Sequence, residues 1–340
     1  MARLASRLTS TGNLLTRGEL NEVAGTTIRL TINNQYAAFF DEIDLQGATD
    51  VAKRETNTGT ILISGYFDEV TLSPNITTGQ QAYTTTGTHS WTCPSGVFSV
   101  SVVCIGGGGG GGRFDYSYAS GAGGGLGWRN NISVTPGQSY TVVVGGGGAS
   151  GIPVGEQAGQ NGGDSYFIST GTVAGFGGTR GNGSYGYGNQ AGGGYVGQGG
   201  GTGGRGQAGA GGAGGYTGNG GDGWVYDAVG TQNLPSGGAG AGAGVTFGDT
   251  LSNGGGGVGI YGQTATATTA SQGGSGGSTG GSFYYGISGS YVNGGVGGSF
   301  GGGGGGGNNS STKGGNGAGG AVRIIWGDGR EFPSIDTEDL

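Results

Sequence analysis

The stretch that decides the fold is GYVGQGGGTGGRGQAGAGGAGGYTGNGG, residues Gly194–Gly221. Glycine occupies every third position from Gly194 to Gly221 without exception. This period matches the polyproline II helix, which has three residues per turn and rises about 3.1 Å per residue. Glycine at every third place removes the side chains from one edge, so neighbouring helices can pack and hydrogen bond backbone to backbone. The alternative is that a segment so rich in glycine produces the period by coincidence.

The wider glycine field, residues 106–320, continues the same step. The chain has 97 glycines in 340 residues, and the field keeps the step of three at 175, 178, 181 and at 295, 298, 301, 304, 307. Collagen would need proline in the triplets, and none lies between Pro153 and Pro235. We expect a bundle of polyproline II rods over 177–320, with at least one turn inside Gly194–Gly221, near Arg205-Gly206-Gln207.

Bulky residues interrupt the glycine runs, which a featureless Gly/Ser linker would not show. We interpret these interruptions as loop tips that join packed rods. Tyrosine and tryptophan are large, rigid and amphipathic, and therefore suit saccharide or protein recognition. The alternative is that about half of them fill gaps between rods or pack on neighbouring subunits. The candidate recognition residues are Tyr116, Tyr118, Tyr185, Tyr187, Trp224, Tyr226, Phe283, Tyr284 and Tyr285.

Composition narrows the class of protein. Hydrophobic residues make up 32% of the chain and charged residues 10%, both below the globular norm. The net charge of −7 would repel nucleic acid. No apolar stretch is long enough to span a membrane as a helix, and Met1–Arg7 lacks the start of a signal peptide. We expect a protein that is made in a cytoplasm and reaches its working place by assembly or lysis, not by secretion.

The first eighty residues contain an internal repeat. Residues 9–23 align with 56–70 at a constant offset of 47, and Phe39–Leu45 is a third, partial copy that matches Tyr66–Leu72. Thr27–Ile32 alternates as a strand does. Each unit is too short to bury a face alone, so we expect the copies to stack on one another or on other subunits. Adjacent acids such as Asp41/Glu42 and Asp68/Glu69 point to opposite faces of a strand, so we interpret them as turn or interface residues.

Strand patterns begin at Tyr83. We expect strands at 88–93 and 97–105 as a hairpin around Pro94-Ser95-Gly96, then at 131–134 and 139–144, a second hairpin over 164–168 and 172–176, and a last strand at Ala321–Trp326. A small β-sandwich built from 81–176 plus 321–327 accommodates these strands, with the bundle at 177–320 as an insertion. The acidic tail, 328–340, is expected to be exposed.

Residues with catalytic or metal-binding chemistry are scarce. Cys93 and Cys104 are the only cysteines, and we expect both to be small buried residues, with a disulfide as the alternative. The one histidine, His89, lies in an expected strand. These residues form no zinc spacing and no Ser/His/Asp arrangement. We expect no enzymatic activity, no metal and no cofactor.

Five segments together resemble the glycine-rich domain of tailed-phage fibre and virion structural proteins, with the closest likeness to cyanophage and other aquatic phage proteins. They are Trp91–Val97, Ser99–Gly108, Thr135–Gly145, Asn161–Phe167 and Gly319–Gly327. The opening, Ser6–Gly12 with Leu20–Val23, is similar to the start of the same class. In some related phage adhesins, loops at the ends of polyproline II helices contact the host receptor. Those adhesins lack the N-terminal repeat, which leaves the place on the virion open.

The resemblance implies a virion structural protein, a tail fibre or adhesin subunit. Residues 1–80 would attach it to other virion proteins and form a homo-oligomer, with a trimer favoured, and the glycine-rich domain would bind a host saccharide or protein. It would bind no nucleic acid and insert into no membrane. The first alternative is a decoration, neck or connector protein with a purely structural role. The second is a cellular glycine-rich protein such as an ice-binding rod bundle, which the aromatic interruptions disfavour.

Overall fold

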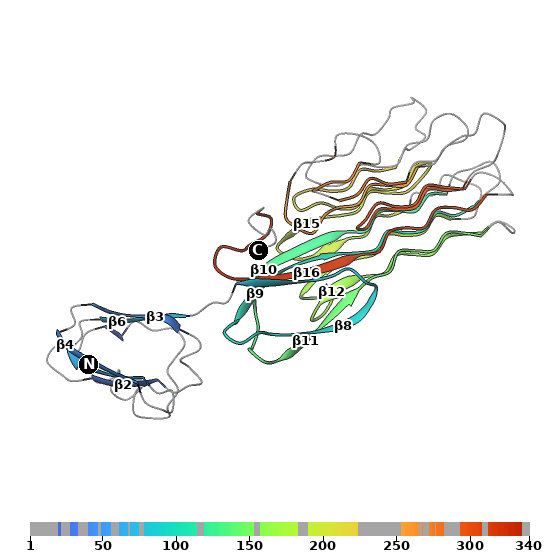
Figure 1. The fold of residues 1–340 in the computed structure, drawn as a ribbon. Helices are drawn as coiled ribbons and strands as arrows, with labels where there is room; N and C mark the ends of the chain where they lie inside the picture. The colour runs from blue at the N-terminus through green and yellow to red at the C-terminus, as the bar shows by residue number, and fades with distance from the viewer. Residues whose placement is uncertain are drawn as a thin grey trace. The chain divides into compact units, whose positions relative to one another are not determined.

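The chain divides into two units in a computed structural model: residues 1–77 with 94–97, and residues 78–93 with 98–340 (Figure 1). The structure describes residues 78–113, 119–152, 157–182, 190–223, 253–264, 267, 272–275, 277–281, 293–307 and 312–334, and the backbone of the strands within 20–74.

The N-terminal unit contains two three-stranded antiparallel sheets. One has the order β1 (Leu20–Asn21), β6 (Glu69–Pro74), β3 (Phe40–Gln46), and the other β2 (Ile28–Ile32), β5 (Ile61–Tyr66), β4 (Thr49–Glu55). In the first sheet Ile43 pairs with Leu72 and Leu45 pairs with Val70. In the repeat Ile43 corresponds to Val70 and Leu45 corresponds to Leu72, so the two copies pair with each other in reciprocal, antiparallel order across β3 and β6, centred on the pair Asp44 and Thr71. The strand expected at Thr27–Ile32 is confirmed as β2.

The second unit begins with two five-stranded sheets. The first has the order β15 (Gly199–Gly201), β10 (Leu126–Ser133), β9 (Ser99–Ile105), β16 (Ala321–Trp326), β7 (Gly79–Tyr83), and the second β14 (Tyr195–Val196), β13 (Val173–Gly175), β12 (Ser165–Phe167), β11 (Ser139–Val144), β8 (Gly87–Thr92). All pairs are antiparallel. The described residues therefore confirm a mainly β fold, and the strand expected at Ala321–Trp326 is confirmed in the middle of the first sheet.

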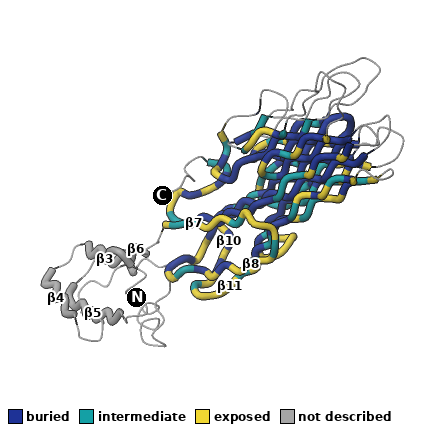
Figure 2. Tube along the Cα trace, turned by 45° about the vertical axis from the view of Figure 1, so that its right-hand side comes forward, coloured by how far each residue is buried: buried dark blue, intermediate teal, exposed yellow. Residues whose placement is uncertain are grey.

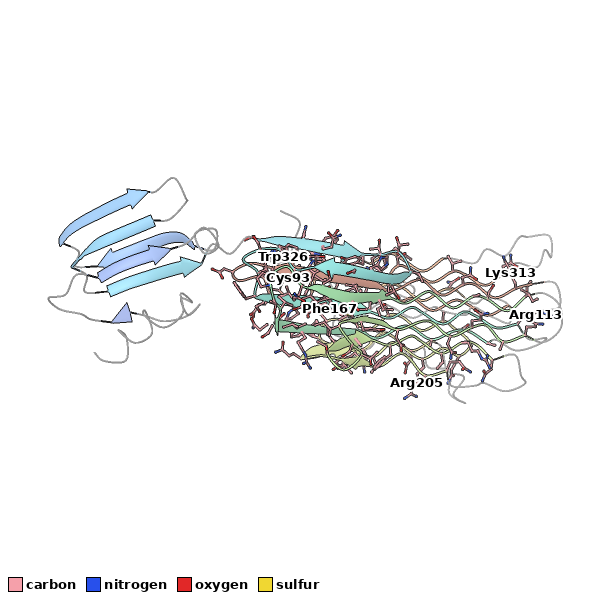
Figure 3. All side chains as sticks on the ribbon, turned by 90° about the horizontal axis from the view of Figure 1, so that it is seen from below. Cys93, Arg113, Phe167, Arg205, Lys313 and Trp326 are labelled. Atoms are coloured by element: carbon pink, nitrogen blue, oxygen red, sulfur yellow. The ribbon has the colours of Figure 1, made fainter. Side chains whose placement is uncertain are left out.

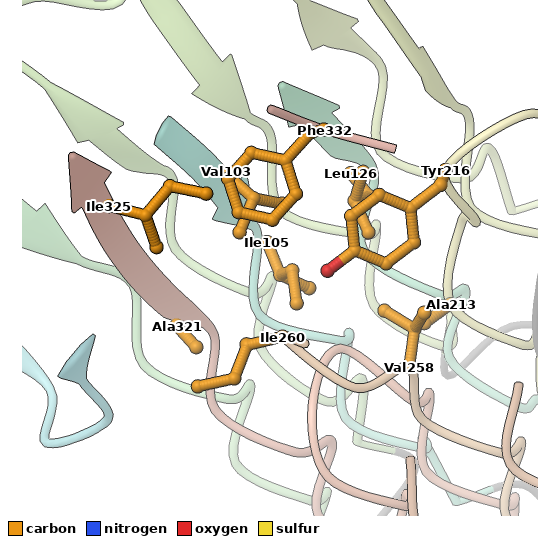
Figure 4. Packing of buried hydrophobic residues seen from close by; sticks show 10 residues of the cluster. All are labelled: Val103, Ile105, Leu126, Ala213, Tyr216, Val258, Ile260, Ala321, Ile325 and Phe332. Atoms are coloured by element: carbon orange, nitrogen blue, oxygen red, sulfur yellow. The ribbon is translucent and has the colours of Figure 1, made fainter. Parts of the chain in front are cut away.

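The first sheet is covered on both faces, which explains why β9 and β16 are buried along almost their whole length. Cys104 of β9 faces the second sheet, where its thiol donates to the Val173 carbonyl at 3.7 Å. Val103 and Ile105 point the other way, into a cluster completed by residues of the glycine field (Figure 4). That cluster contains Val103, Ile105, Leu126, Ala213, Tyr216, Val258, Ile260, Ala321, Ile325 and Phe332.

The hairpin expected around Pro94-Ser95-Gly96 is wrong. β8 pairs with β11, and β9 pairs with β10 and β16, so this turn links strands of different sheets. The reason is that the chain just after β8 pairs with the turn before β11. Cys93 N donates to Gln138 O at 2.9 Å and Gly137 N donates to Cys93 O at 2.8 Å. These two bonds extend the β8–β11 pairing beyond Thr92. The hairpin expected over 164–176 is confirmed as β12 and β13.

The glycine-rich segments form a lattice of rods, which the segment 106–113 after β9 illustrates. Its N–H groups donate to three neighbouring rods in turn, so that every third residue donates to the same rod. The rod 119–125 accepts from Gly106, Gly109 and Gly112. The rod 157–164 accepts from Gly107, Gly110 and Arg113, and the rod 312–320 accepts from Gly108 and Gly111. The carbonyls of 106–113 accept from three further rods, 176–182, 145–152 and 301–307, at the same step. A rod with three residues per turn and inter-rod bonds on all sides is the polyglycine form of the polyproline II helix, as the period-three sequence predicts.

Three rods, 106–113, 119–125 and 301–307, are each hydrogen bonded to six others, and all their residues are buried (Figure 2). A Cβ added at Gly108 would overlap the carbonyl oxygen of Gly302, and one added at Gly121 would overlap the carbonyl oxygen of Gly109. Central rods therefore require a very small residue at nearly every position. A surface rod such as 312–320 instead carries exposed side chains three residues apart, at Lys313 and Asn316.

The run Gly194–Gly221 is folded back on itself. It contains β14 and β15, and then bends at 207–209 and 216–218. The pieces pack side by side, because Gly204 N donates to Gly212 O and Gly212 N donates to Gly221 O. The turn expected near Arg205-Gly206-Gln207 is thereby confirmed. Rods also occur before residue 177, where the expected bundle begins, since 106–113 continues β9 and 145–152 continues β11.

The tail is partly buried, which contradicts its expected exposure. Arg330 is 6% exposed and Phe332 is 2% exposed. Asn130 binds both sides of the Phe332 backbone, donating from Nδ2 to the carbonyl at 2.7 Å and accepting the N–H at 2.9 Å. The Phe332 ring stacks on Tyr216 with 5.8 Å between centroids. The free energy gained by burying the aromatic ring outweighs the cost of burying the polar residues beside it in the sequence. Residues 335–340 lie outside the described residues.

Candidate receptor-binding end of the glycine-rich bundle

The rods leave the sandwich and finish at a common end, which is organised around Arg113. Arg113 N donates to Gln157 O at 2.8 Å, Gly112 N donates to Ala119 O at 2.6 Å, and Gly307 N donates to Gly112 O at 3.0 Å. Four chain segments thus finish or begin beside one another. Arg113, Arg205 and Lys313 lie at this end of the bundle, opposite Cys93 and Trp326 (Figure 3). We call it the distal end.

The nine predicted receptor-binding residues all lie outside the described residues: Tyr116, Tyr118, Tyr185, Tyr187, Trp224, Tyr226, Phe283, Tyr284 and Tyr285. The described residues that precede and follow their segments can be placed. Arg113 and Ala119 flank the first pair, Asn182 and Gln190 the second, Gly223 and Asn253 the third, and Gly281 and Asn293 the last three.

These flanking residues belong to the distal end. Gln190 pairs with Gly206, and Gly223 N donates to Arg205 O at 2.7 Å. On the other side, Gly254 N donates to Gly281 O at 3.1 Å and Gly294 N donates to Lys313 O at 2.9 Å. The four aromatic segments, distant in sequence, therefore start and finish at one end of one bundle.

Basic side chains also occur near this end, although they are far apart in the sequence and were not predicted to form a group. Arg180, Arg205 and Lys313 are exposed, whereas Arg113 is 3% exposed. Arg205 Nε lies 3.9 Å from Asp222 Oδ2, and since both side chains are largely exposed this ion pair adds little stability. The signal that could have grouped these residues is their position where a glycine run ends.

The two cysteines and Tyr216 are buried in the packing of the second unit. Cys93 and Cys104 are both buried and form no disulfide, as expected. Burial raises the pKa of the Cys93 thiol to about 11 and also raises the pKa of the Cys104 thiol. The pKa of Tyr216 is raised by burial too, and its hydroxyl donates to Gly259 O at 3.1 Å. His89 Nε2 lies 2.8 Å from Thr85 O.

Within the ranges that the structure describes, no group of His, Cys, Asp and Glu side chains is arranged to hold a metal ion. Over the same ranges, no helix has the length and apolar character needed to cross a membrane.

A glycine-rich domain family model matches residues 84–327 of the chain. Because the match spans most of the chain, the protein belongs to this glycine-rich domain family. The matched region begins just before β8 and ends just after β16, so it contains the bundle and every strand of the sandwich except the edge strand β7. No curated protein matches the chain significantly.

Proposed function

We propose that the protein is a structural component of a phage virion, a tail fibre or adhesin subunit whose distal end binds a receptor on the host surface. The observation that carries the proposal is the common location of the residues that flank all four aromatic segments. A receptor site needs recognition residues held together by a rigid support. The lattice offers such a support, because its central rods are bonded to six neighbours.

The chemistry of the segments favours a saccharide or protein ligand. Tyrosine and tryptophan provide broad contact with few rotatable bonds, so little conformational entropy is lost on binding. Four separate segments around one support can also vary in sequence without disturbing the rods. This arrangement suits a protein that must follow changes in a host receptor.

We assign virion attachment and homo-oligomerisation, with a trimer favoured, to the N-terminal unit. Its sheets have three strands each, and such small sheets gain stability by association. The paired copies of the repeat, at β3 and β6, supply a self-complementary pattern of backbone groups.

The test is adsorption of virions that carry Trp224→Ala and Tyr226→Ala. We expect assembled particles in normal number with strongly reduced binding to host cells. A matched control is Ile168→Asn, which changes an exposed residue in the β12–β13 turn. Ile168 has φ of 66°, a conformation that asparagine tolerates well. Normal adsorption of the double variant would refute the assignment of the distal end.

The second candidate is a decoration, neck or connector protein with a purely structural role. It is favoured by the extent of the lattice, which would suit a rigid spacer without any ligand. Imaging of virions that carry a labelled copy separates the two. A position on the head or neck supports the structural role, whereas a position at the tip of the tail supports receptor binding.

A further inference from the structure

Asparagine and aspartate side chains join neighbouring rods in a recurring way. In each case the side-chain Oδ1 accepts a backbone N–H from the next rod. The acceptor–donor pairs are Asn161–Arg180 at 2.9 Å, Asp164–Gly177 at 2.9 Å, Asn219–Thr202 at 3.0 Å, Asp222–Arg205 at 2.7 Å, Asn293–Lys313 at 3.0 Å and Asn316–Ser150 at 2.9 Å. We call this contact the Asx staple.

The lattice explains why the staple is needed. Between rods 157–164 and 176–182, the backbone bonds run from the first rod to the second, as from Gly159 N to Gly181 O. The N–H groups of Gly177 and Arg180 point back toward the first rod, where side-chain oxygens accept them. An unpaired backbone N–H costs free energy when it is withdrawn from water, so an oxygen on a short side chain is favoured there.

Four staples carry a chemical hazard, because their asparagine precedes a glycine: Asn161-Gly162, Asn219-Gly220, Asn293-Gly294 and Asn316-Gly317. In a flexible chain, the glycine nitrogen attacks the asparagine Cγ and loses its proton. A new N–Cγ bond forms and the amide nitrogen leaves as ammonia. Water then opens the succinimide ring at either carbonyl, which gives aspartate or isoaspartate. Glycine speeds the attack because no side chain hinders it.

Both reacting groups are held in the folded bundle. The side-chain carbonyl is fixed by the staple, and the glycine N–H donates to a carbonyl of the same neighbouring rod. That second bond is 2.9 Å long at all four pairs, from Gly162 to Gly178, Gly220 to Thr202, Gly294 to Lys313 and Gly317 to Gly148. The extended rod conformation also keeps the nitrogen away from Cγ. Ring closure therefore requires both inter-rod bonds to break.

The two products would affect the lattice differently. Asp164 and Asp222 already make the staple with a carboxylate, so conversion of asparagine to aspartate preserves the contact. Isoaspartate instead routes the main chain through an extra carbon. This shifts every later residue of the rod relative to its hydrogen-bond partners, which a close-packed lattice cannot absorb.

We propose that these four Asn-Gly pairs are deamidation sites that the folded bundle silences, so that isoaspartate at any of them marks a molecule whose rods have opened. The chain uses this labile dipeptide because the lattice needs a short oxygen-bearing side chain and an adjacent glycine. The same lattice then protects it, which favours a long lifetime for the folded protein.

The test follows deamidation of the full-length protein at mildly alkaline pH, in native buffer and in concentrated urea, by site-resolved mass spectrometry that separates aspartate from isoaspartate. We expect all four pairs to react at least about tenfold more slowly in native buffer, the factor that about 1.4 kcal/mol of opening free energy imposes. A smaller difference at any of the four pairs would overturn the proposal.

Asp328→Asn supplies the matched control, since it creates an Asn-Gly pair at two exposed residues outside the bundle. We expect this pair to deamidate readily in native buffer. If it reacted as slowly as the four pairs in the bundle, the lattice would not be the cause of their slow deamidation. A second variant, Gly108→Ala, crowds rod 106–113 against its neighbours. It should accelerate the reaction at Asn316, whose rod accepts the Gly108 N–H. An unchanged rate at Asn316 in a demonstrably destabilised variant would also count against the proposal.

Discussion

At the scale of the residue, the lattice requires glycine at positions where a neighbouring rod leaves no room for a side chain. A Cβ at Gly108 would overlap the Gly302 carbonyl, whereas one at Gly319 would lie 3.8 Å from the Thr86 hydroxyl, an ordinary contact. Two glycines of one bundle thus differ in whether they can be replaced by a residue with a side chain. The difference follows from how many rods surround each of them, and period-three counting alone does not reveal it.

We predict that Gly108→Ala lowers the free energy of unfolding by about 3 kcal/mol, the upper range for overpacking a dense interior. Gly319→Ala should change it by less than about 1 kcal/mol, because the methyl group makes only ordinary van der Waals contacts and alanine restricts the unfolded chain. Urea denaturation of the two variants measures both values. Equal effects would contradict the packing argument.

The buried thiols give a prediction about pH. Since burial raises the pKa of Cys93 to about 11 and also raises that of Cys104, the folded protein should resist alkylation at pH values where the unfolded chain reacts at both thiols. The sign of the linkage follows. The unfolded thiols lose protons near their ordinary pKa, so stability is complete below that pH and falls as the pH rises toward 11. Thermal unfolding across this range, with Cys93→Ala as the control, measures the loss.

At the scale of the element, some features could be read from the sequence and others could not. The strand at 321–326 was predictable because its apolar residues and flanking glycines are local signals. The destination of the Pro94-Ser95-Gly96 turn was not, because a tight turn permits either a hairpin or a change of sheet, and distant Gln138 decides between them. The aromatic segments were predictable as interruptions, but their common end depends on contacts such as that between Gly112 and Ala119.

The number of neighbours explains the glycine content of each rod. The rods at 106–112 and 301–307 are unbroken glycine in the sequence, and both are surrounded on all sides. A surface rod needs glycine only where it faces its neighbours, and its remaining positions carry polar residues such as Asn316. An uninterrupted glycine run in such a protein therefore indicates a central rod. This rule can be applied to sequence alone.

The C-terminal segment gives a prediction at the same scale. Phe332 fills a site beside Tyr216, and Asn130 satisfies its backbone. Deletion of residues 328–340 should expose the core cluster and cost about 3 kcal/mol, from the lost aromatic burial and the unpaired Asn130 side chain. We expect a lower melting temperature and increased binding of a hydrophobic dye. A truncated protein with unchanged melting would show that Phe332 occupies the site without stabilising it.

At the scale of the whole molecule, sandwich and bundle share rods, strands and core. The cluster around Ile105 combines strand residues with Ala213 and Val258 of the glycine field. The rods continue the strands without a break, so neither part has a separate interior. Each rod of the bundle is hydrogen bonded to segments that are remote in sequence. This makes folding of the bundle slow and its unfolding cooperative.

We predict that sandwich and bundle unfold in a single transition. Gly111→Ala places a methyl group against the Gly305 carbonyl, far along the rod from β9. With Trp224 replaced by phenylalanine, its effect should appear equally in the fluorescence of the remaining tryptophans, Trp91, Trp128 and Trp326 in the sandwich, and in hydrogen exchange of the rod amides. Independent parts would behave differently, with the exchange midpoint falling and the fluorescence midpoint unchanged. Coincident shifts would mean that a disturbance near the distal end is felt throughout this unit, as expected where the glycine rods continue the strands of the sandwich.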